Sequence, residues 1–221
     1  MVVKNLLLGL FLAVILGLPQ ASFAKTFTFW PEHDAWVNEA NPDVNYGSNT
    51  YFSVKDRSDI AETYLKFSDS DLNQLRGLNI NSASLNLFQY QATYSFGDTI
   101  NAHKVNSVWD EGSLTWNSKP GFETQSSAFL GFSDGNNVWR EWYGLENCVA
   151  SWLTGPNYGL VLENHCDGID NELFARFYSS EFPLLENRPF LRVTTTPEPL
   201  SATLFLLGGA SMLLRNYFPK I

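Results

Sequence analysis

The chain contains little cysteine, methionine or histidine, with two, two and three copies among its 221 residues. Such sparse and scattered ligands do not form the usual zinc-site patterns, in which Cys and His follow one another closely. No serine or cysteine nucleophile motif surrounds His33, His103 or His165, so a catalytic triad is not indicated. A glycosidase pair of carboxylates remains open, because their separation in space does not follow from their spacing along strands.

The sequence also lacks an apolar run as long as a permanent membrane helix requires. The N-terminal run, residues 6–18, follows Lys4 and precedes the triplet Ser22-Phe23-Ala24. This pattern is typical of a secretory signal peptide that is cleaved after Ala24. The C-terminal run, residues 200–214, makes a helix of roughly 22 Å, against ~30 Å of hydrocarbon.

These two ends divide the chain into three predicted parts. Residues 1–24 form the signal peptide, residues 25–196 form one functional domain, and residues 197–221 form a short membrane-active tail. We expect hydrophobic targeting helices at both ends. The protein is therefore expected to be exported.

Basic residues are scarce in the predicted exported part. The chain has 14 basic and 23 acidic residues, and without both apolar ends residues 25–199 keep 11 basic and 23 acidic residues, a net charge of −12. Such a surface repels nucleic acid and anionic lipid headgroups, so we expect no nucleic-acid partner. Neutral glycans, or acidic glycans bridged by a cation, remain open as partners.

Short alternating segments separated by turn residues dominate the middle of the chain. Alternation at period two predicts antiparallel strands with one buried face. The predicted strands are residues 26–29, 51–55, 63–67, 83–88, 100–105, 138–143, 158–162, 173–178 and 190–195. Many short strands with few helices favour an all-β fold, an antiparallel β-sandwich of the jelly-roll type.

One short helix stands out among these strands. Leu145, Val149 and Trp152 recur at helical spacing before the stop signal Gly155-Pro156, so we expect a helix that caps one end of the sandwich. Residues 71–75 are a candidate for a single helical turn. Trp152 is expected in the core.

The two cysteines, Cys148 and Cys166, both lie in the predicted exported domain. An oxidising compartment favours a disulfide between them. Two buried free thiols and a metal site are the alternatives.

The tail begins with Pro197-Glu198-Pro199, continues as the apolar run and ends with Arg215 and Lys220. This order resembles the PEP-CTERM sorting signals of Gram-negative bacteria, although such tails usually end in a cluster of arginines. The resemblance implies transient anchoring in the inner membrane and processing by an exosortase-like membrane enzyme. The destination would then be the cell surface or the extracellular matrix. A plain C-terminal membrane anchor is the alternative.

The body carries a second set of ordered segments. They read DAWV at 34–37, NYGS at 45–48, YLKF at 64–67, SASL at 82–85, VWDEGSLTWN at 108–117, WLTGPNYGL at 152–160, FYSSE at 177–181 and RPFL at 188–191. In this order the body resembles the DNRLRE domain, a secreted jelly roll grouped with carbohydrate-binding module family 96. Residues 132–146 fit the pattern poorly. The resemblance implies a glycan-binding or matrix-associated module.

Aromatic residues make up 15% of the chain, and aromatic rings bind sugars by stacking against the apolar face of a pyranose. Tyr90, Tyr94 and Phe96 crowd the approach to a predicted hairpin turn, where rings are expected to be partly exposed. Trp139 and Trp142 alternate with charged residues, so one of the two rings is expected to face outward. These five residues are the candidate carbohydrate-binding residues, with a role in the core as the alternative for each.

Two tryptophans, Trp109 and Trp116, flank a polar turn that contains Asp110-Glu111. We expect both rings to belong to the core. The adjacent carboxylates would point to opposite faces of an extended segment, so they are interpreted as part of the turn and not as a catalytic pair.

No cofactor is indicated, although a structural calcium ion is possible. Calcium takes several oxygen ligands, which two segments of the chain offer. One contains Asn41, Asp43 and Asn45, and the other contains Asp167 and Asp170. Neither has the spacing of an EF-hand loop.

The sequence therefore predicts a non-catalytic, exported polysaccharide-binding module. The first alternative is a structural matrix or adhesion protein without a defined sugar site. The second is a polysaccharide lyase or hydrolase.

Overall fold

Antiparallel strands make up most of the described chain. The computed structural model describes residues 24–196 except 58, 94–98, 132–134 and 166–173. The strands are β1 (Lys25–Phe29), β2 (Pro31–Asn38), β3 (Tyr51–Lys55), β4 (Ala61–Phe67), β5 (Asn79–Thr93), β6 (Thr99–Lys104), β7 (Ala128–Gly131), β8 (Val138–Tyr143), β9 (Leu160–His165), β10 (Phe174–Tyr178) and β11 (Phe190–Thr196). The helical segments are α2 (Asp69–Leu72), η1 (Asn73–Leu75), α3 (Glu146–Thr154) and η2 (Leu185–Asn187). The predicted all-β class is confirmed.

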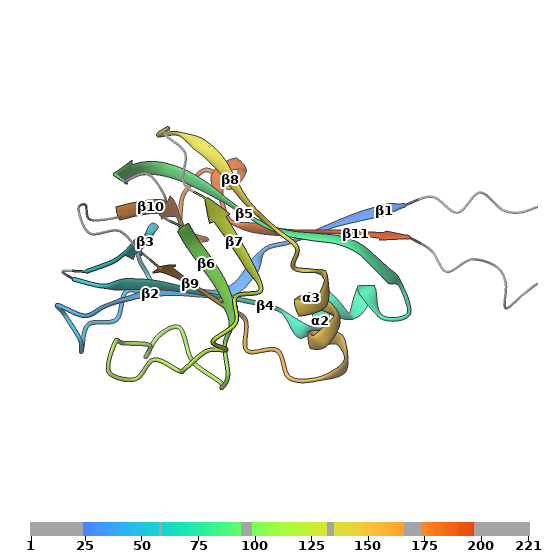
Figure 1. Cartoon of the computed structure of the whole chain (residues 1–221), viewed down its shortest axis with the longest axis horizontal. Coiled ribbons are helices and arrows are strands. Elements are labelled where there is room, and N and C mark those ends of the chain that lie inside the picture. Colours follow the sequence, from blue (N-terminus) through green and yellow to red (C-terminus); the bar gives the residue numbers. More distant parts are fainter. Residues whose placement is uncertain (1–23, 58, 94–98, 132–134, 166–173, 197–221) are drawn as a thin grey trace, which may run out of the picture. The chain divides into compact units, whose positions relative to one another are not determined.

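The strands join into one curled sheet that branches at two places. Its order is β1-β11-β5-β10-β3-β4-β9-β6-β7, while β2 pairs with β4 and β8 pairs with β5. Figure 1 shows the long strand β5, which has 15 residues, running beside β8 and β11. Because β5 contacts three neighbours, residues from distant parts of the chain share one face of the sheet there. The more specific jelly-roll topology stays a prediction.

Alternation along the strands places one set of side chains in the main hydrophobic core. Leu85 and Leu87 of β5, Phe177 of β10 and Leu191 of β11 are fully buried in it. Burying one such side chain stabilises the fold by about 1.5–3 kcal/mol. The side chains between these positions point to the opposite face of the sheet.

A second hydrophobic cluster lies on the other side of β4. It contains Tyr64 and Trp109, and Trp116 packs against it while remaining partly exposed. The indole N–H of Trp109 donates to the carbonyl oxygen of Tyr158 at 2.8 Å. The core prediction is therefore confirmed for Trp109, and Trp116 lies at the margin of the cluster.

Helix α3 packs its apolar face against the sheet, as its sequence predicts. Val149 and Trp152 are buried. The N–H of Leu145 donates to the carbonyl oxygen of Ala83 at 3.1 Å, and the carboxylate of Glu146 accepts from the N–H of Ala83 at 3.1 Å. These bonds fix the start of α3 to β5. The prediction for residues 71–75 also agrees with the helical segment that α2 and η1 form.

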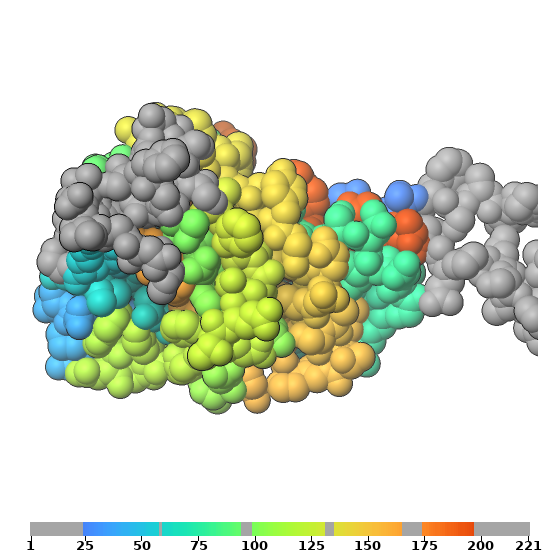
Figure 2. Space-filling view, viewed as in Figure 1, coloured from blue at the N-terminus to red at the C-terminus, as the bar shows by residue number. Residues whose placement is uncertain are grey.

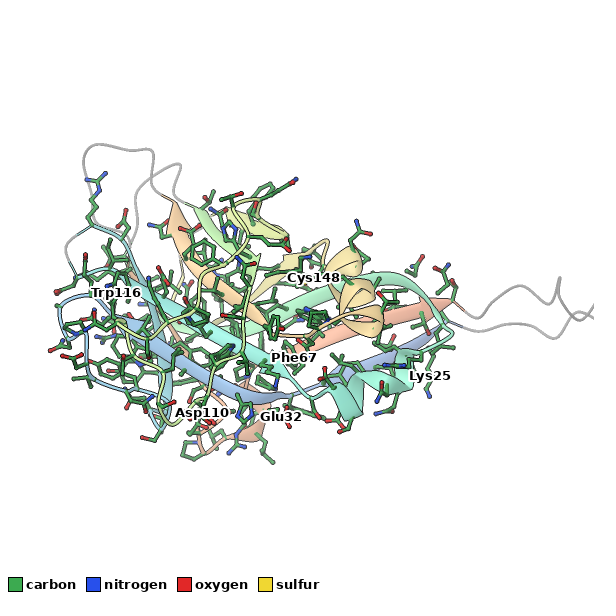
Figure 3. All side chains as sticks on the ribbon, turned by 90° about the horizontal axis from the view of Figure 1, so that it is seen from below. Lys25, Glu32, Phe67, Asp110, Trp116 and Cys148 are labelled. Atoms are coloured by element: carbon green, nitrogen blue, oxygen red, sulfur yellow. The ribbon has the colours of Figure 1, made fainter. Side chains whose placement is uncertain are left out.

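The predicted disulfide is not present in the structure. Cys148 is a buried free thiol, and Figure 3 labels it on α3. It faces the core, where burial raises the pKa of its thiol to about 12, and such a thiol is chemically inert at neutral pH. Cys166 lies outside the described residues.

The loop between β6 and β7 covers one part of the sheet. Figure 2 shows this yellow-green segment lying against the blue segment that follows β2. The side-chain amide of Asn45 donates to the carbonyl oxygens of Glu111 and Leu114 at 2.7 and 2.8 Å. The turn at Asp110 is closed by a bond from the N–H of Leu114 to the Asp110 carbonyl oxygen, 2.9 Å long. The interpretation of Asp110-Glu111 as part of a turn agrees with this geometry.

No helix in the described part of the chain is long and apolar enough to cross a membrane. Both predicted targeting helices, from residues 1–23 and 197–221, lie outside the described residues. The same holds for the sorting-signal residues Pro197, Glu198, Pro199 and Arg215.

Candidate functional site

The pairing of β8 with β5 determines which of the two candidate tryptophans, Trp139 and Trp142, is exposed to solvent. In its antiparallel pairing with β5, Trp142 lies opposite Leu85 and Trp139 lies opposite Phe88. Leu85 points into the core, and Trp142 is fully buried beside it, with its indole N–H donating to the carbonyl oxygen of Ile100 at 2.9 Å. The prediction that Trp142 contacts a sugar is therefore wrong. Trp139 is 41% exposed.

The outward residues of β8 form a row of ring, carboxylate and ring. Trp139, Glu141 and Tyr143 alternate with inward residues, and Tyr143 is 67% exposed. The two rings are four residues apart on one strand, or about 14 Å at ~3.4 Å per residue. Residues of β5 and β11 that point to the same side adjoin this row, and two of them, Ser84 and Asn86, are themselves buried. We call this surface the aromatic face, and its members are Ser84, Asn86, Phe88, Trp139, Glu141, Tyr143, Phe190 and Arg192.

Two neighbouring rings hold Trp139 in place. Phe88 meets it edge to face, with ring centroids 5.5 Å apart, and the centroid of Phe190 is 5.2 Å away. Aromatic pairs of this geometry contribute about 0.5–1.5 kcal/mol beyond the area they bury. The indole is therefore fixed before any ligand arrives, which lowers the entropic cost of stacking.

Glu141 is the polar centre of the aromatic face. Its carboxylate accepts from the Ser84 hydroxyl at 2.6 Å and lies 3.7 Å from the Arg192 guanidinium. The Tyr143 hydroxyl donates to its other oxygen. This hydrogen bond, followed by desolvation, raises the pKa of Tyr143, so the phenol stays a proton donor. Acceptors and donors thus lie between the two exposed rings.

Tyr90 belongs to a stack of rings beside this face. Its centroid lies 4.7 Å from that of Tyr178 with nearly parallel planes, and Tyr51 approaches its edge. Burial raises the pKa of Tyr90. Because Tyr178 already occupies one face of the ring, Tyr90 supports the surface more than it offers a free face. The other candidates, Tyr94 and Phe96, lie outside the described residues.

Tyr143, Phe190 and Arg192 were not among the predicted site residues. Tyr143 could have been predicted from the sequence, because it lies four residues after Trp139 on the same predicted strand and therefore points to the same side. Phe190 and Arg192 could not have been predicted from the sequence, since only the pairing of β11 with β5 brings them to this face.

Three acidic residues, Asp34, Glu111 and Glu181, form a second cluster, which we call the acidic trio. Asp34 comes from β2, Glu111 from the loop between β6 and β7, and Glu181 from the turn after β10. One carboxylate oxygen from each lies within 4.8 Å of the others. Glu32 and Asp110, labelled in Figure 3, mark the two segments that carry Asp34 and Glu111, and they lie at the same edge of that view.

Electrostatics at this acidic trio are unfavourable for Asp34. Its side chain is 1% exposed. Burial, and next the charge of Glu181, raise the pKa of Asp34 well above its usual value, while hydrogen bonds from Ser180 lower it only in part. Glu111 adds a further negative charge. Burial and neighbouring like charges disfavour the ionised form of a carboxyl group, and an adjacent cation offsets this effect.

The first segment considered for calcium is engaged elsewhere. Asn45 donates to the loop carbonyls described above, Asp43 accepts from the Asn117 side-chain amide at 2.8 Å, and the amide of Asn41 donates to Asn38 at 3.1 Å. Asp167 and Asp170 lie outside the described residues.

Two of the hollows on the described surface are lined by other residues. One of about 540 Å³ lies between η1 and α3 and is lined by Leu78, Ile80 and Leu153, among others. The other, of about 270 Å³, is lined by Lys104, Ser127 and Cys148, among others. No aromatic side chain lines either hollow, so neither offers a ring on which a sugar can stack.

Comparison with known proteins assigns residues 25–195 to a family. A sequence profile of carbohydrate-binding module family 96 matches residues 25–195. The chain is also 26% identical over 180 residues to the tRNA3(Ser)-specific nuclease WapA of Bacillus spizizenii and 26% identical over 182 residues to the tRNA nuclease WapA of Bacillus subtilis. Each alignment covers 74% of this chain and 7% of the relative. The chain therefore corresponds to a small part of these proteins.

Proposed function

The chain belongs to carbohydrate-binding module family 96, and we propose that it binds a neutral polysaccharide at the aromatic face, without catalysis. The observation that carries this proposal is the row on β8, in which the exposed rings of Trp139 and Tyr143 flank Glu141. Two rings on one side of a strand offer two stacking positions along a glycan chain.

The polar groups of the face suit sugar hydroxyls. Glu141 accepts hydrogen bonds, and the Arg192 guanidinium and the Tyr143 hydroxyl donate them. Each of these groups has a partner in the free protein, so a sugar hydroxyl replaces a bond and leaves no polar atom unpaired. The mixed charge of this centre and the acidic character of the chain favour a neutral glycan over a polyanion.

Retention on polysaccharides tests the proposal. A polypeptide of residues 25–196, which contains the compact unit Thr26–Thr195, is run through gels that contain neutral or acidic polysaccharides. We expect retardation by at least one neutral polysaccharide and loss of that retardation in the double variant Trp139→Ala/Tyr143→Ala. Trp116→Ala is the matched control, since Trp116 is a partly exposed tryptophan of the loop between β6 and β7 and packs against the second hydrophobic cluster. Unchanged mobility of the wild type in every gel would favour a structural matrix protein.

We further propose that the two ends of the chain determine its location. Residues 1–24 would direct export, and residues 197–221 would anchor the protein transiently in the inner membrane until an exosortase-like enzyme processes it. The mature module would then reach the cell surface or matrix. We expect a tag fused to the C-terminus to be absent from the mature protein in the native host. A tag that persists on the surface protein would point to a simple anchor.

A further inference from the structure

The hydrogen bonds around the acidic trio leave two carboxylate oxygens without a partner. The Asp34 Oδ2 atom accepts from the N–H of Ser180 at 3.1 Å, and the Glu181 Oε1 atom accepts from the Ser180 hydroxyl at 2.9 Å. The other oxygens, Asp34 Oδ1 and Glu181 Oε2, are buried and accept no hydrogen bond. Buried carboxylate oxygens without partners are costly, so these two atoms point to a missing ligand.

Few basic groups lie near the acidic trio to balance the negative charge of its three carboxylates. Among the described residues, the basic group at ion-pair distance is the imidazole of His33, whose Nδ1 lies 3.5 Å from the Glu111 carboxylate. The other Glu111 oxygen accepts from the N–H of Asp34 at 3.2 Å. Three carboxylates therefore face one another with one imidazole beside them.

The surrounding backbone holds the three carboxylates in this arrangement. Asn45 fixes the main chain at Glu111, and Gly47 lies so close that a Cβ there would overlap the Glu111 carbonyl oxygen. The Ser179 hydroxyl donates to the carbonyl oxygen of Asn49 at 2.6 Å and accepts from the N–H of Glu181 at 3.2 Å. The three carboxylates thus come from β2, from the loop after β6 and from the turn after β10, and the segment before β3 supports them.

We propose that Asp34, Glu111 and Glu181 bind one calcium ion. Calcium takes oxygen ligands at 2.3–2.6 Å, so two oxygens of one ion lie at most about 5 Å apart, and the separation of at most 4.8 Å between the three oxygens fits this limit. All three ligands are hard carboxylate oxygens, which suit calcium rather than zinc. Glu181 is partly exposed, so water has access to complete the coordination shell.

The ion would be a common ligand of three segments that already hydrogen-bond to one another. It would tie β2 to the loop between β6 and β7 and to the turn after β10. That turn also carries Phe182, whose ring stacks on Tyr178 with centroids 3.5 Å apart. Calcium would therefore stabilise this end of the sheet, independently of whether the aromatic face binds a sugar.

Calcium titration of the full-length protein, after removal of metals with a chelator, tests the site. We expect calorimetry to give one calcium per chain and the melting temperature to rise with calcium concentration, because a ligand of the native state stabilises it by mass action. Magnesium at the same concentration should produce a smaller rise. No calcium response, or an equal response to magnesium, would overturn the assignment.

Isosteric variants locate the ion. Asp34→Asn and Glu181→Gln each keep the shape of the side chain and should weaken calcium binding at least tenfold, while Glu186→Gln, on the exposed helical turn η2, should bind as the wild type does. Both site variants should fold without calcium, since each removes one of three repelling charges. Wild-type calcium affinity in both would place the ion elsewhere and refute the site. Retained calcium binding with no sugar retention would leave this site intact and reject only the aromatic face.

Discussion

At the scale of single residues, His103 is a buried side chain whose two ring nitrogens both face acceptors. Its Nδ1 lies 2.8 Å from the Glu123 carbonyl oxygen, and its Nε2 lies 3.0 Å from the Glu163 carboxylate. Only the protonated ring donates to both. Burial by itself lowers the pKa of His103, but the hydrogen bonds to Glu163 and Glu123 raise it by more, so that the pKa lies above the ordinary value of 6.5.

This residue makes the stability of the fold depend on pH. A histidine whose pKa is raised by folding stabilises the native state fully below its ordinary pKa and loses that contribution as the pH rises through the higher value. We expect His103→Gln to flatten the fall in the free energy of unfolding as the pH rises above the ordinary histidine pKa of about 6.5. Urea denaturation of both proteins across this range measures the difference. Parallel pH curves would show that His103 stays neutral in the folded state.

The sequence predicts the kinds of residue at the two sites better than their positions. Trp139 and Trp142 are three residues apart on a strand, so they must face opposite sides, but only the register with β5 shows which one is buried. The acidic trio gives no local signal. Its members are 77 and 70 positions apart along the chain, and only the pairing of strands brings them together.

At the scale of elements, the start of β9 approaches β4 closely at Gly159. Its φ angle is +84°, and a Cβ there would overlap the carbonyl oxygen of Leu65 and lie 2.9 Å from the Cα of Lys66. Its N–H donates to the Asn157 side chain at 3.0 Å. Leu160 then pairs with Leu65. A glycine at this point allows β9 to enter the sheet.

Two glycine variants separate backbone strain from this close contact. Gly77 also has a positive φ angle, +75°, but a Cβ there would meet no atom within 4 Å. We expect Gly77→Ala to cost about 1–2 kcal/mol, from the left-handed backbone alone. Gly159→Ala adds a clash with β4 and should lower the free energy of unfolding by at least about 3 kcal/mol. Equal losses in urea denaturation would mean that β9 moves away from β4 without cost.

Most strands of the sheet follow from alternation in the sequence, and the exceptions have a physical cause. Strand β2 was not predicted, because its last five residues, Asp34 to Asn38, are all buried and the polar–apolar alternation is lost. Strand β7 has four residues, too few for a periodic pattern. Strand β5 extends beyond the predicted residues 83–88 because β8, β10 and β11 supply partners along its length.

At the scale of the whole molecule, the negative net charge and the family membership both favour a carbohydrate ligand over a nucleic acid. The acidic chain disfavours polyanionic ligands, and the nuclease relatives align over only 7% of their length. Two candidate sites of different chemistry occur in the described part of the chain. The aromatic face offers stacking rings for a glycan, and the acidic trio offers oxygen ligands for a cation.

The most direct test of the central claim is the affinity of Trp139→Ala for the polysaccharide that retains the wild type. Calorimetric titration should show binding weakened at least tenfold, since one stacking position is lost, while Trp116→Ala binds as the wild type does. Circular dichroism should show that Trp139→Ala remains folded, because Trp139 is partly exposed. Wild-type affinity in a folded Trp139→Ala protein would contradict the assignment of the aromatic face as the sugar site.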